Sequence, residues 1–116
     1  MPYIPWIYSS SLQSSSFHVL GSKMLEKNIE KQLVLETKRM RGIALKFTSP
    51  GFVGVPDRLV LLPGGKLAFV EVKREGEKPR AIQVARHKLL RNLGFKVYVL
   101  DSKKMIKEIL NEIQTT

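Results

Sequence analysis

The 116-residue sequence contains no cysteine. Disulfide bonds, thiolate zinc sites and cysteine nucleophiles are therefore excluded, and the composition fits a reducing compartment. No apolar run approaches the roughly 20 residues that a membrane-spanning helix needs, so we expect no part in a membrane. The N-terminus lacks both the basic region and the long apolar region of a secretory signal peptide.

Acidic residues are scarce beside basic ones. Ten Asp and Glu stand against twenty Lys and Arg, which gives a net charge of +10 and a pI of about 10.1. Such an excess suits a polyanionic partner, and nucleic acid comes before an acidic membrane surface or an acidic protein. Many basic proteins carry only solvated charge, so the charge favours nucleic acid without establishing it.

The first 23 residues contain no acid and show no helical or strand periodicity. The pair Gly21-Ser22 before Met24 resembles a cloning scar. We therefore expect residues 1–23 to be a vector-derived or flexible leader and residues 24–116 to be the folded domain. A native frayed tail is the alternative.

From Met24 onward the apolar spacing predicts the element order αβββαβα. We expect a helix over about 25–41, strands over 43–47, 57–62 and 67–73, a helix over 79–93, a strand over 95–100 and a last helix from about 102. The strand 95–100 is almost wholly apolar, which indicates an interior strand. The second helix should turn Ile82, Ala85, Leu89 and Leu90 inward. A hairpin followed by a helical crossover implies an α/β fold with a mixed sheet flanked by helices.

Three charged residues stand out by their positions. Asp57 begins the second strand, while Glu71 and Lys73 lie near the end of the third. Side chains two apart on a strand share a face, so Glu71 and Lys73 point the same way. A two-residue hairpin about Gly64-Gly65 with equal arms would bring Asp57 opposite Lys73 or just beyond it. Two acids and a base should therefore converge at one end of the hairpin.

A charged group on a strand flanked by apolar residues is unfavourable in a sheet interior unless something compensates it. A divalent cation held by Asp57, Glu71 and the carbonyl of Val72 would do so, and these oxygen ligands suit Mg²⁺ or Mn²⁺. Lys73 could then orient or deprotonate an attacking water and stabilise transition-state charge. The alternative is an ordinary Glu71–Lys73 pair on an exposed edge, with Asp57 as a strand cap.

The segments Gly54-Val55-Pro56-Asp57 and Phe69-Val70-Glu71-Val72-Lys73, followed by Gln83, resemble the virus-type replication-repair nuclease (VRR-NUC) family, a branch of the PD-(D/E)XK nucleases. The resemblance covers essentially all of residues 24–116. It implies that Asp57 and Glu71 bind the metal, that Lys73 is the catalytic lysine and that Gln83 supports the site. Glu26 matches the first-helix acid that reaches the metal shell in this family. From the residues alone, Glu26 could equally be a solvated helix charge and Gln83 a surface amide.

The same resemblance bears on the substrate. Stand-alone phage members resemble homodimers that cut four-way DNA junctions, whereas the domain in larger eukaryotic nucleases is monomeric and cuts flaps. The resemblance thus implies a homodimeric Holliday junction resolvase of a phage or prophage, acting on branched DNA in the cytoplasm of a bacterial host. A flap or single-strand nuclease and a catalytically silent nucleic-acid-binding module are the alternatives.

Basic residues surround the expected site and are candidates for contacts with DNA phosphates. They are Lys46, Arg58, Arg74, Lys78, Arg80, Arg86, Lys88 and Arg91. His87 lies four residues after Gln83 on the same helical face, and we interpret it as a packing or surface histidine.

Overall fold

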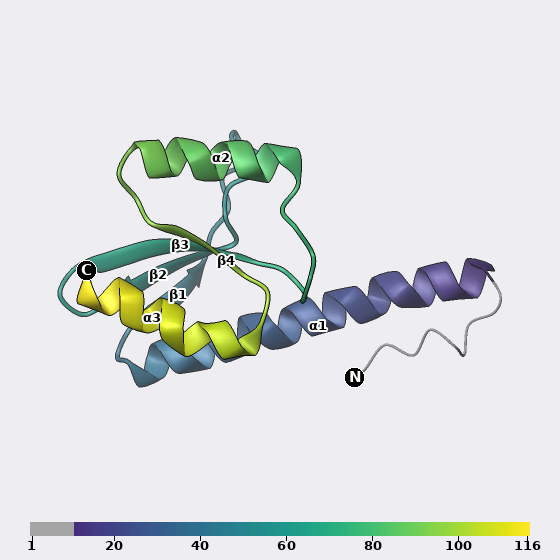
Figure 1. Ribbon diagram of the computed structural model, residues 1–116, viewed down its shortest axis with the longest axis horizontal. Helices are drawn as coiled ribbons and strands as arrows, with labels where there is room; N and C mark the ends of the chain where they lie inside the picture. Colours follow the sequence, from purple (N-terminus) through teal and green to yellow (C-terminus); the bar gives the residue numbers. More distant parts are fainter. Residues whose placement is uncertain (1–10) are drawn as a thin grey trace.

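The computed structural model describes residues 11–116 (Figure 1). Its elements are α1 (Ser11–Arg39), β1 (Ile43–Lys46), β2 (Arg58–Leu62), β3 (Lys66–Val72), α2 (Ala81–Asn92), β4 (Val97–Leu100), the 3₁₀ turn η2 (Lys103–Met105) and α3 (Ile106–Thr115). The order αβββαβα and the α/β class are confirmed. No helix in this part of the chain is long and apolar enough to cross a membrane.

The first helix is longer than its expected range. It begins at Ser11, so the expected start near residue 25 is wrong, and residues 11–23 are helical rather than irregular. Residues 1–10 of the expected leader lie outside the described residues, and the vector origin of the leader stays a prediction.

Gly42 follows α1 closely, at a place where glycine often ends a helix in the left-handed conformation. Arg41, not Gly42, takes the left-handed conformation, with φ 63°. The Gly42 N–H donates to the Thr37 carbonyl at 3.0 Å. A Cβ on Gly42 would collide with the Leu61 carbonyl oxygen and the Leu62 side chain. Gly42 is therefore required because the backbone approaches β2 closely, not because it has a positive φ.

The sheet has the strand order β1-β2-β3-β4. The first three strands are antiparallel neighbours, and β4 pairs parallel with β3, so the sheet is mixed as expected. In Figure 1, α1 and α3 cover one face and α2 lies over the other. The expectation that the apolar strand 95–100 lies inside the sheet is wrong, because β4 is an edge strand. Its Val97 and Leu100 are nevertheless buried, since the crossovers place helices above and below this edge.

The hairpin between β2 and β3 sets the register of the site. Leu62 pairs with Lys66, so the loop has three residues, 63–65, rather than two. Gly64 and Gly65 in this loop both have positive φ, 86° and 74°. Arg58 lies opposite Val70, and Asp57, one residue before it, is therefore in line with Glu71. The expected position opposite Lys73 is wrong, because the observed pairing of Leu62 with Lys66 places Asp57 two residues earlier along β3.

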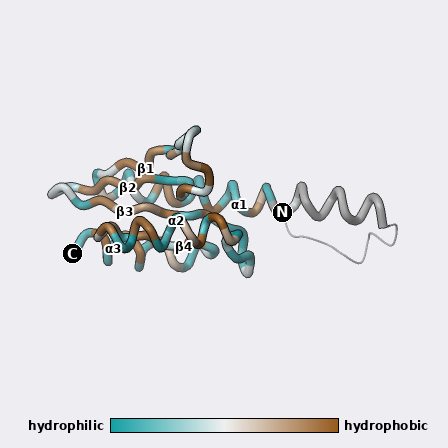
Figure 2. Tube along the Cα trace, turned by 90° about the horizontal axis from the view of Figure 1, so that it is seen from above, coloured by the Kyte–Doolittle hydropathy of each residue, from teal (hydrophilic) through white to brown (hydrophobic). Residues whose placement is uncertain are grey.

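The two faces of the sheet differ in chemistry. On the side of α1 and α3, apolar side chains form one continuous core, and Ile106, Ile109, Leu110 and Ile113 of α3 are all buried, as their spacing predicts. Figure 2 shows hydrophobic stretches along the strands and along α3.

On the opposite side, α2 buries Gln83 and His87. Ile82, Ala85 and Leu89 are exposed and only Leu90 is half-buried, so the expected inward face of this helix is wrong for three of its four residues. The face under α2 therefore combines a polar network around Glu71 with the buried ring of Phe69, which packs against Phe47 and Phe95.

Candidate active site

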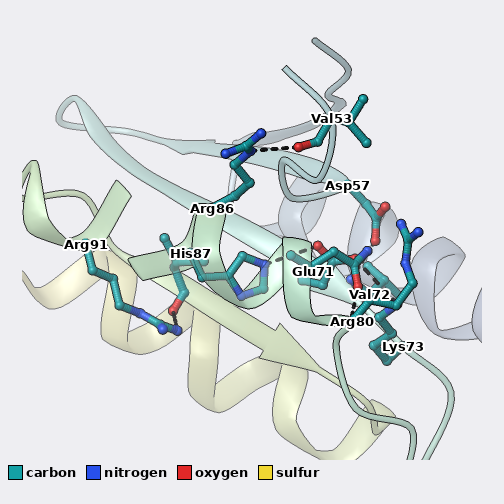
Figure 3. A network of polar contacts seen from close by, with 11 residues as sticks. Val53, Asp57, Glu71, Val72, Lys73, Arg80, Arg86, His87 and Arg91 are labelled. Carbon is teal, nitrogen blue, oxygen red and sulfur yellow. Dashed lines mark hydrogen bonds and ion pairs between the residues drawn. The ribbon is translucent and has the colours of Figure 1, made fainter. Parts of the chain in front are cut away.

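The hairpin register brings Asp57 and Glu71 together. Asp57 precedes β2, and its Oδ2 accepts a hydrogen bond from the Val72 N–H at 2.9 Å (Figure 3). This bond fastens the end of one strand to the neighbouring strand. The prediction that two acids and a lysine converge at this end of the hairpin is consistent with the observed geometry.

Glu71 is almost completely enclosed, with 1% of its surface exposed. Its Oε2 accepts a hydrogen bond from Gln83 Nε2 at 3.0 Å and lies 3.9 Å from the Lys73 ammonium. Its Oε1 lies 3.2 Å from His87 Nε2. Both carboxyl oxygens are therefore positioned by protein groups.

The ionisation of Glu71 reflects this enclosure. Burial is the largest effect, followed by the hydrogen bond to Asp57 and the negative charge of Asp57, and together they raise the pKa of Glu71 to about 8. The positive charge of Lys73 acts in the opposite direction but does not compensate. The protein alone therefore does not stabilise two ionised carboxylates at this position.

Glu26 on α1 faces the same carboxylates. Burial and then the charge of Asp57 raise the pKa of Glu26. The next acid on the helix, Glu30, is engaged elsewhere, because it accepts a hydrogen bond from Arg58 Nε at 2.8 Å. The structure thus brings Glu26 toward the site from a third element.

The donor set can be compared with the needs of a metal ion. Residues 11–116 contain no preformed group of three or more His, Cys, Asp or Glu side chains arranged around one ion position. The chain offers instead the adjoining carboxylates of Asp57 and Glu71. It also offers the Val72 carbonyl, which points toward Asp57 because the N–H and C=O of one strand residue face the same side. Few protein oxygens plus water ligands suit Mg²⁺, and a cation here would offset the charge that raises the pKa of Glu71.

Both the oxygen and the nitrogen of the Gln83 side-chain amide form hydrogen bonds. Its Oε1 accepts the Arg80 N–H at 2.9 Å, at the start of α2, and its Nε2 donates to Glu71. This pair of bonds fixes the orientation of the amide and links the first turn of α2 to the buried carboxyl group.

His87 was missed as a site residue by the sequence interpretation. It is 2% exposed and contacts Glu71, and burial, followed by the charge of Arg91, lowers the pKa of His87. A neutral imidazole at this position orients the carboxyl group without adding charge. The four-residue spacing of Gln83 and His87 was the available signal, since it places both side chains on one face of α2.

The eight expected phosphate-contacting residues divide into two groups. Three are bonded within the protein: Arg58 to Glu30 and the Ala44 carbonyl, Arg86 to the Val53 carbonyl, and Arg91 to the Val97 carbonyl. Lys46, Lys78, Arg80 and Lys88 are exposed, and Arg74 is half-buried with its Nε enclosed and unbonded. Contacts with DNA stay a prediction for all eight. The exposed side chains are the ones most accessible to DNA phosphates.

Comparisons with known proteins agree with this geometry. No family model matches the chain. The chain is 55% identical over 80 residues to "Putative nuclease p44" of Acyrthosiphon pisum secondary endosymbiont phage 1, covering 69% of this chain and 86% of that protein. It is also similar to a solved structure described as "VRR_NUC domain", with a TM-score of 0.70 and 32% identity over 74% of this chain and 94% of the solved chain. The family resemblance inferred from the sequence is thereby confirmed.

Proposed function

Because the chain belongs to the VRR_NUC family of nucleases, we propose that it is a Mg²⁺-dependent endonuclease that hydrolyses phosphodiester bonds in branched DNA. Mn²⁺ should substitute for Mg²⁺. The observation that carries the proposal is Glu71, a carboxyl group 1% exposed, beside Asp57, with its pKa raised to about 8. Such a group is unfavourable in the protein alone, and perturbed carboxyl groups of this kind are typical of functional sites.

The residues around the pair have separable roles in this proposal. Asp57, Glu71 and the Val72 carbonyl would hold the cation, and Glu26 would reach its outer shell. The ion would supply Lewis-acid stabilisation of phosphate charge and would lower the pKa of a water. Lys73 carries its ammonium group 3.9 Å from Glu71 Oε2, where it can position the attacking water and stabilise the negative charge of the transition state. Gln83 and His87 hold Glu71 in place.

The proposed substrate is a four-way DNA junction. The net charge of +10 supports a phosphate-rich partner read by its shape and backbone. A flap or single-stranded DNA is the second candidate. The resemblance of the sequence to stand-alone phage members of the family favours the junction.

We also propose that the protein is a homodimer. On the side of α2, Ile43 and Leu45 of β1 are 51% and 41% exposed. Leu89 of α2 and Leu93, which follows the helix, are 42% and 67% exposed. Exposed apolar residues gathered on one side of a domain are candidates for a protein interface. A second copy on this face would give two active sites related by a two-fold axis, as paired cuts in a symmetric junction require.

Cleavage of labelled DNA tests the proposed function. Four-way junction, flap and duplex DNA are incubated with the protein and Mg²⁺ or Mn²⁺, with Asp57→Asn as the matched inactive variant. We expect paired symmetric cuts in the junction by the wild type and none by the variant, which still binds. Binding without cutting by the wild type in either metal would instead support the binding module.

Light scattering tests the dimer. The wild type should be a dimer at tens of micromolar, and Leu89→Glu should be monomeric because the added charge would be buried at the interface. Leu35→Glu, at a position 50% exposed on α1, is the matched control and should stay dimeric. A monomeric wild type would contradict the proposal.

A further inference from the structure

The loop between β1 and β2 is fastened against α2 beside the site. The Arg86 Nε donates to the Val53 carbonyl at 2.7 Å (Figure 3). Gly54 has φ +95°, and a Cβ on this residue would meet Ile82 and Arg86 at 2.9 and 3.1 Å. Only glycine allows this approach without strain. The loop therefore has a defined position next to the carboxylates.

The tip of this loop is apolar although its surroundings are polar and basic. Phe52 is 37% exposed and Val53 is 63% exposed. The Arg86 guanidinium lies 3.7 Å from the centre of the Phe52 ring. One face of the ring is thus backed by a cation that holds it in place, and the exposed part of the ring is available to another planar group.

A pocket of about 330 Å³ lies between this loop and the first turn of α2. Phe47 and Phe52 line it on the loop side, Arg80 and Gln83 line it on the helix side, and Asp57 belongs to the same wall. A flat group that contacts the aromatic wall would therefore lie beside the Asp57 carboxylate. Arg80, exposed at the rim, could contact the phosphate attached to such a group.

We propose that Phe52, backed by Arg86, stacks on an unpaired base of the DNA next to the phosphate that is cut. The inference rests on the proposed function and specifies how the site would select its substrate. Every base has a flat π-face, so stacking on an aromatic side chain is tolerant of sequence. Bases in a fully paired duplex are already stacked, whereas a branch point offers unpaired ones at a low energetic cost. Phe52 would thus favour branched over continuous duplex DNA.

Photocrosslinking tests the contact directly. Branched DNA carries 5-iododeoxyuridine at the nucleotides flanking the branch, is bound by the Asp57→Asn protein, irradiated, and the crosslinked peptide is sequenced by mass spectrometry. We expect the crosslink at Phe52. In the same background, Phe52→Ala should remove it, Phe52→Tyr should keep it, and Leu35→Ala should leave it unchanged.

Binding and cleavage complete the test. Phe52→Ala should weaken binding of branched DNA roughly tenfold, with a smaller change for duplex DNA, and Phe52→Tyr should restore it. A crosslink elsewhere, or equal binding by Phe52→Ala, would overturn the inference. A shift of Phe52→Ala from dimer to monomer with unchanged DNA preference would assign Phe52 to the contact with a second copy and overturn it as well. Absence of cleavage by the wild type would contradict the proposed function, and this result is independent of the outcome for Phe52.

Discussion

Replacing Lys73 with alanine is expected to lower the cleavage rate about 10³-fold while DNA binding changes by less than about threefold. The reason is the position of its ammonium group, 3.9 Å from Glu71 Oε2 and buried with it. Fixed charges in an enclosed site act mainly on the transition state, and the loss of one such group lowers the rate by roughly 10²–10³ or more. Single-turnover cleavage of a labelled junction with saturating protein measures the effect on the chemical step alone.

A matched substitution distinguishes this role of Lys73 from the mere loss of one positive charge. Lys78→Ala removes an exposed lysine from the neighbouring loop and should affect binding slightly and the single-turnover rate little. Lys73→Arg keeps the charge but changes its shape and hydrogen-bonding geometry, so we expect it to stay well below the wild type. If Lys73→Ala cuts at the wild-type rate, Lys73 is only the partner of Glu71, and the assigned role is wrong.

Replacing Glu71 with glutamine is expected to have opposite effects on activity and stability. The variant should lose cleavage, since one of the proposed metal ligands is gone, and should also be more stable than the wild type without metal. At pH 7 the gain should be about 3 kcal/mol, because the unfolded chain ionises this group with a pKa of 4.5 whereas the folded protein, with a pKa of about 8, keeps it protonated. Thermal unfolding in the presence of a chelator measures this difference.

The sign of the pH dependence follows from the same shift. The unfolded chain releases the Glu71 proton above pH 4.5 and the folded protein only near pH 8, so the metal-free wild type should lose stability as the pH rises between these values. Binding of Mg²⁺ should release a proton, and its affinity should rise over the same interval. Glu71→Gln should remove the larger part of both dependences and leave the part due to Glu26, whose pKa is also raised. Glu75→Gln, which changes an exposed acid in the next loop, should keep both in full. Equal stability of wild type and Glu71→Gln at pH 8 would show that the protein itself compensates the carboxylate.

A helix or strand could be predicted from the sequence where a single physical requirement determines its pattern of residues. The spacing of Ile106, Ile109, Leu110 and Ile113 predicts the buried face of α3, because that helix serves only packing. The alternation around Glu71 predicts β3 for the same reason. The carboxylates were identifiable because charge is rare on a strand flanked by valines, which is a local property of the sequence.

The remaining features depend on contacts between residues distant in the sequence, which a local sequence pattern does not reveal. The register of Asp57 depends on whether Pro63 belongs to the strand or the turn, and a single residue there shifts the pairing. The orientation of α2 could not follow from hydrophobicity, since its buried residues are Gln83 and His87 while Ile82, Val84 and Leu89 are exposed. The polar residues of α2 are inward because they bind Glu71, and that partner is distant in sequence.

The two faces of the sheet serve different purposes, since one stabilises the fold and the other carries the candidate active site. The aliphatic layer beneath α1 and α3 can hold the four strands together while the residues under α2 are exchanged. Substitutions of active-site residues would then leave the domain folded. Substitutions in the apolar core would leave the active-site residues in position. A domain arranged in this way can acquire new nucleic-acid specificities through substitutions on α2 and the β1–β2 loop alone.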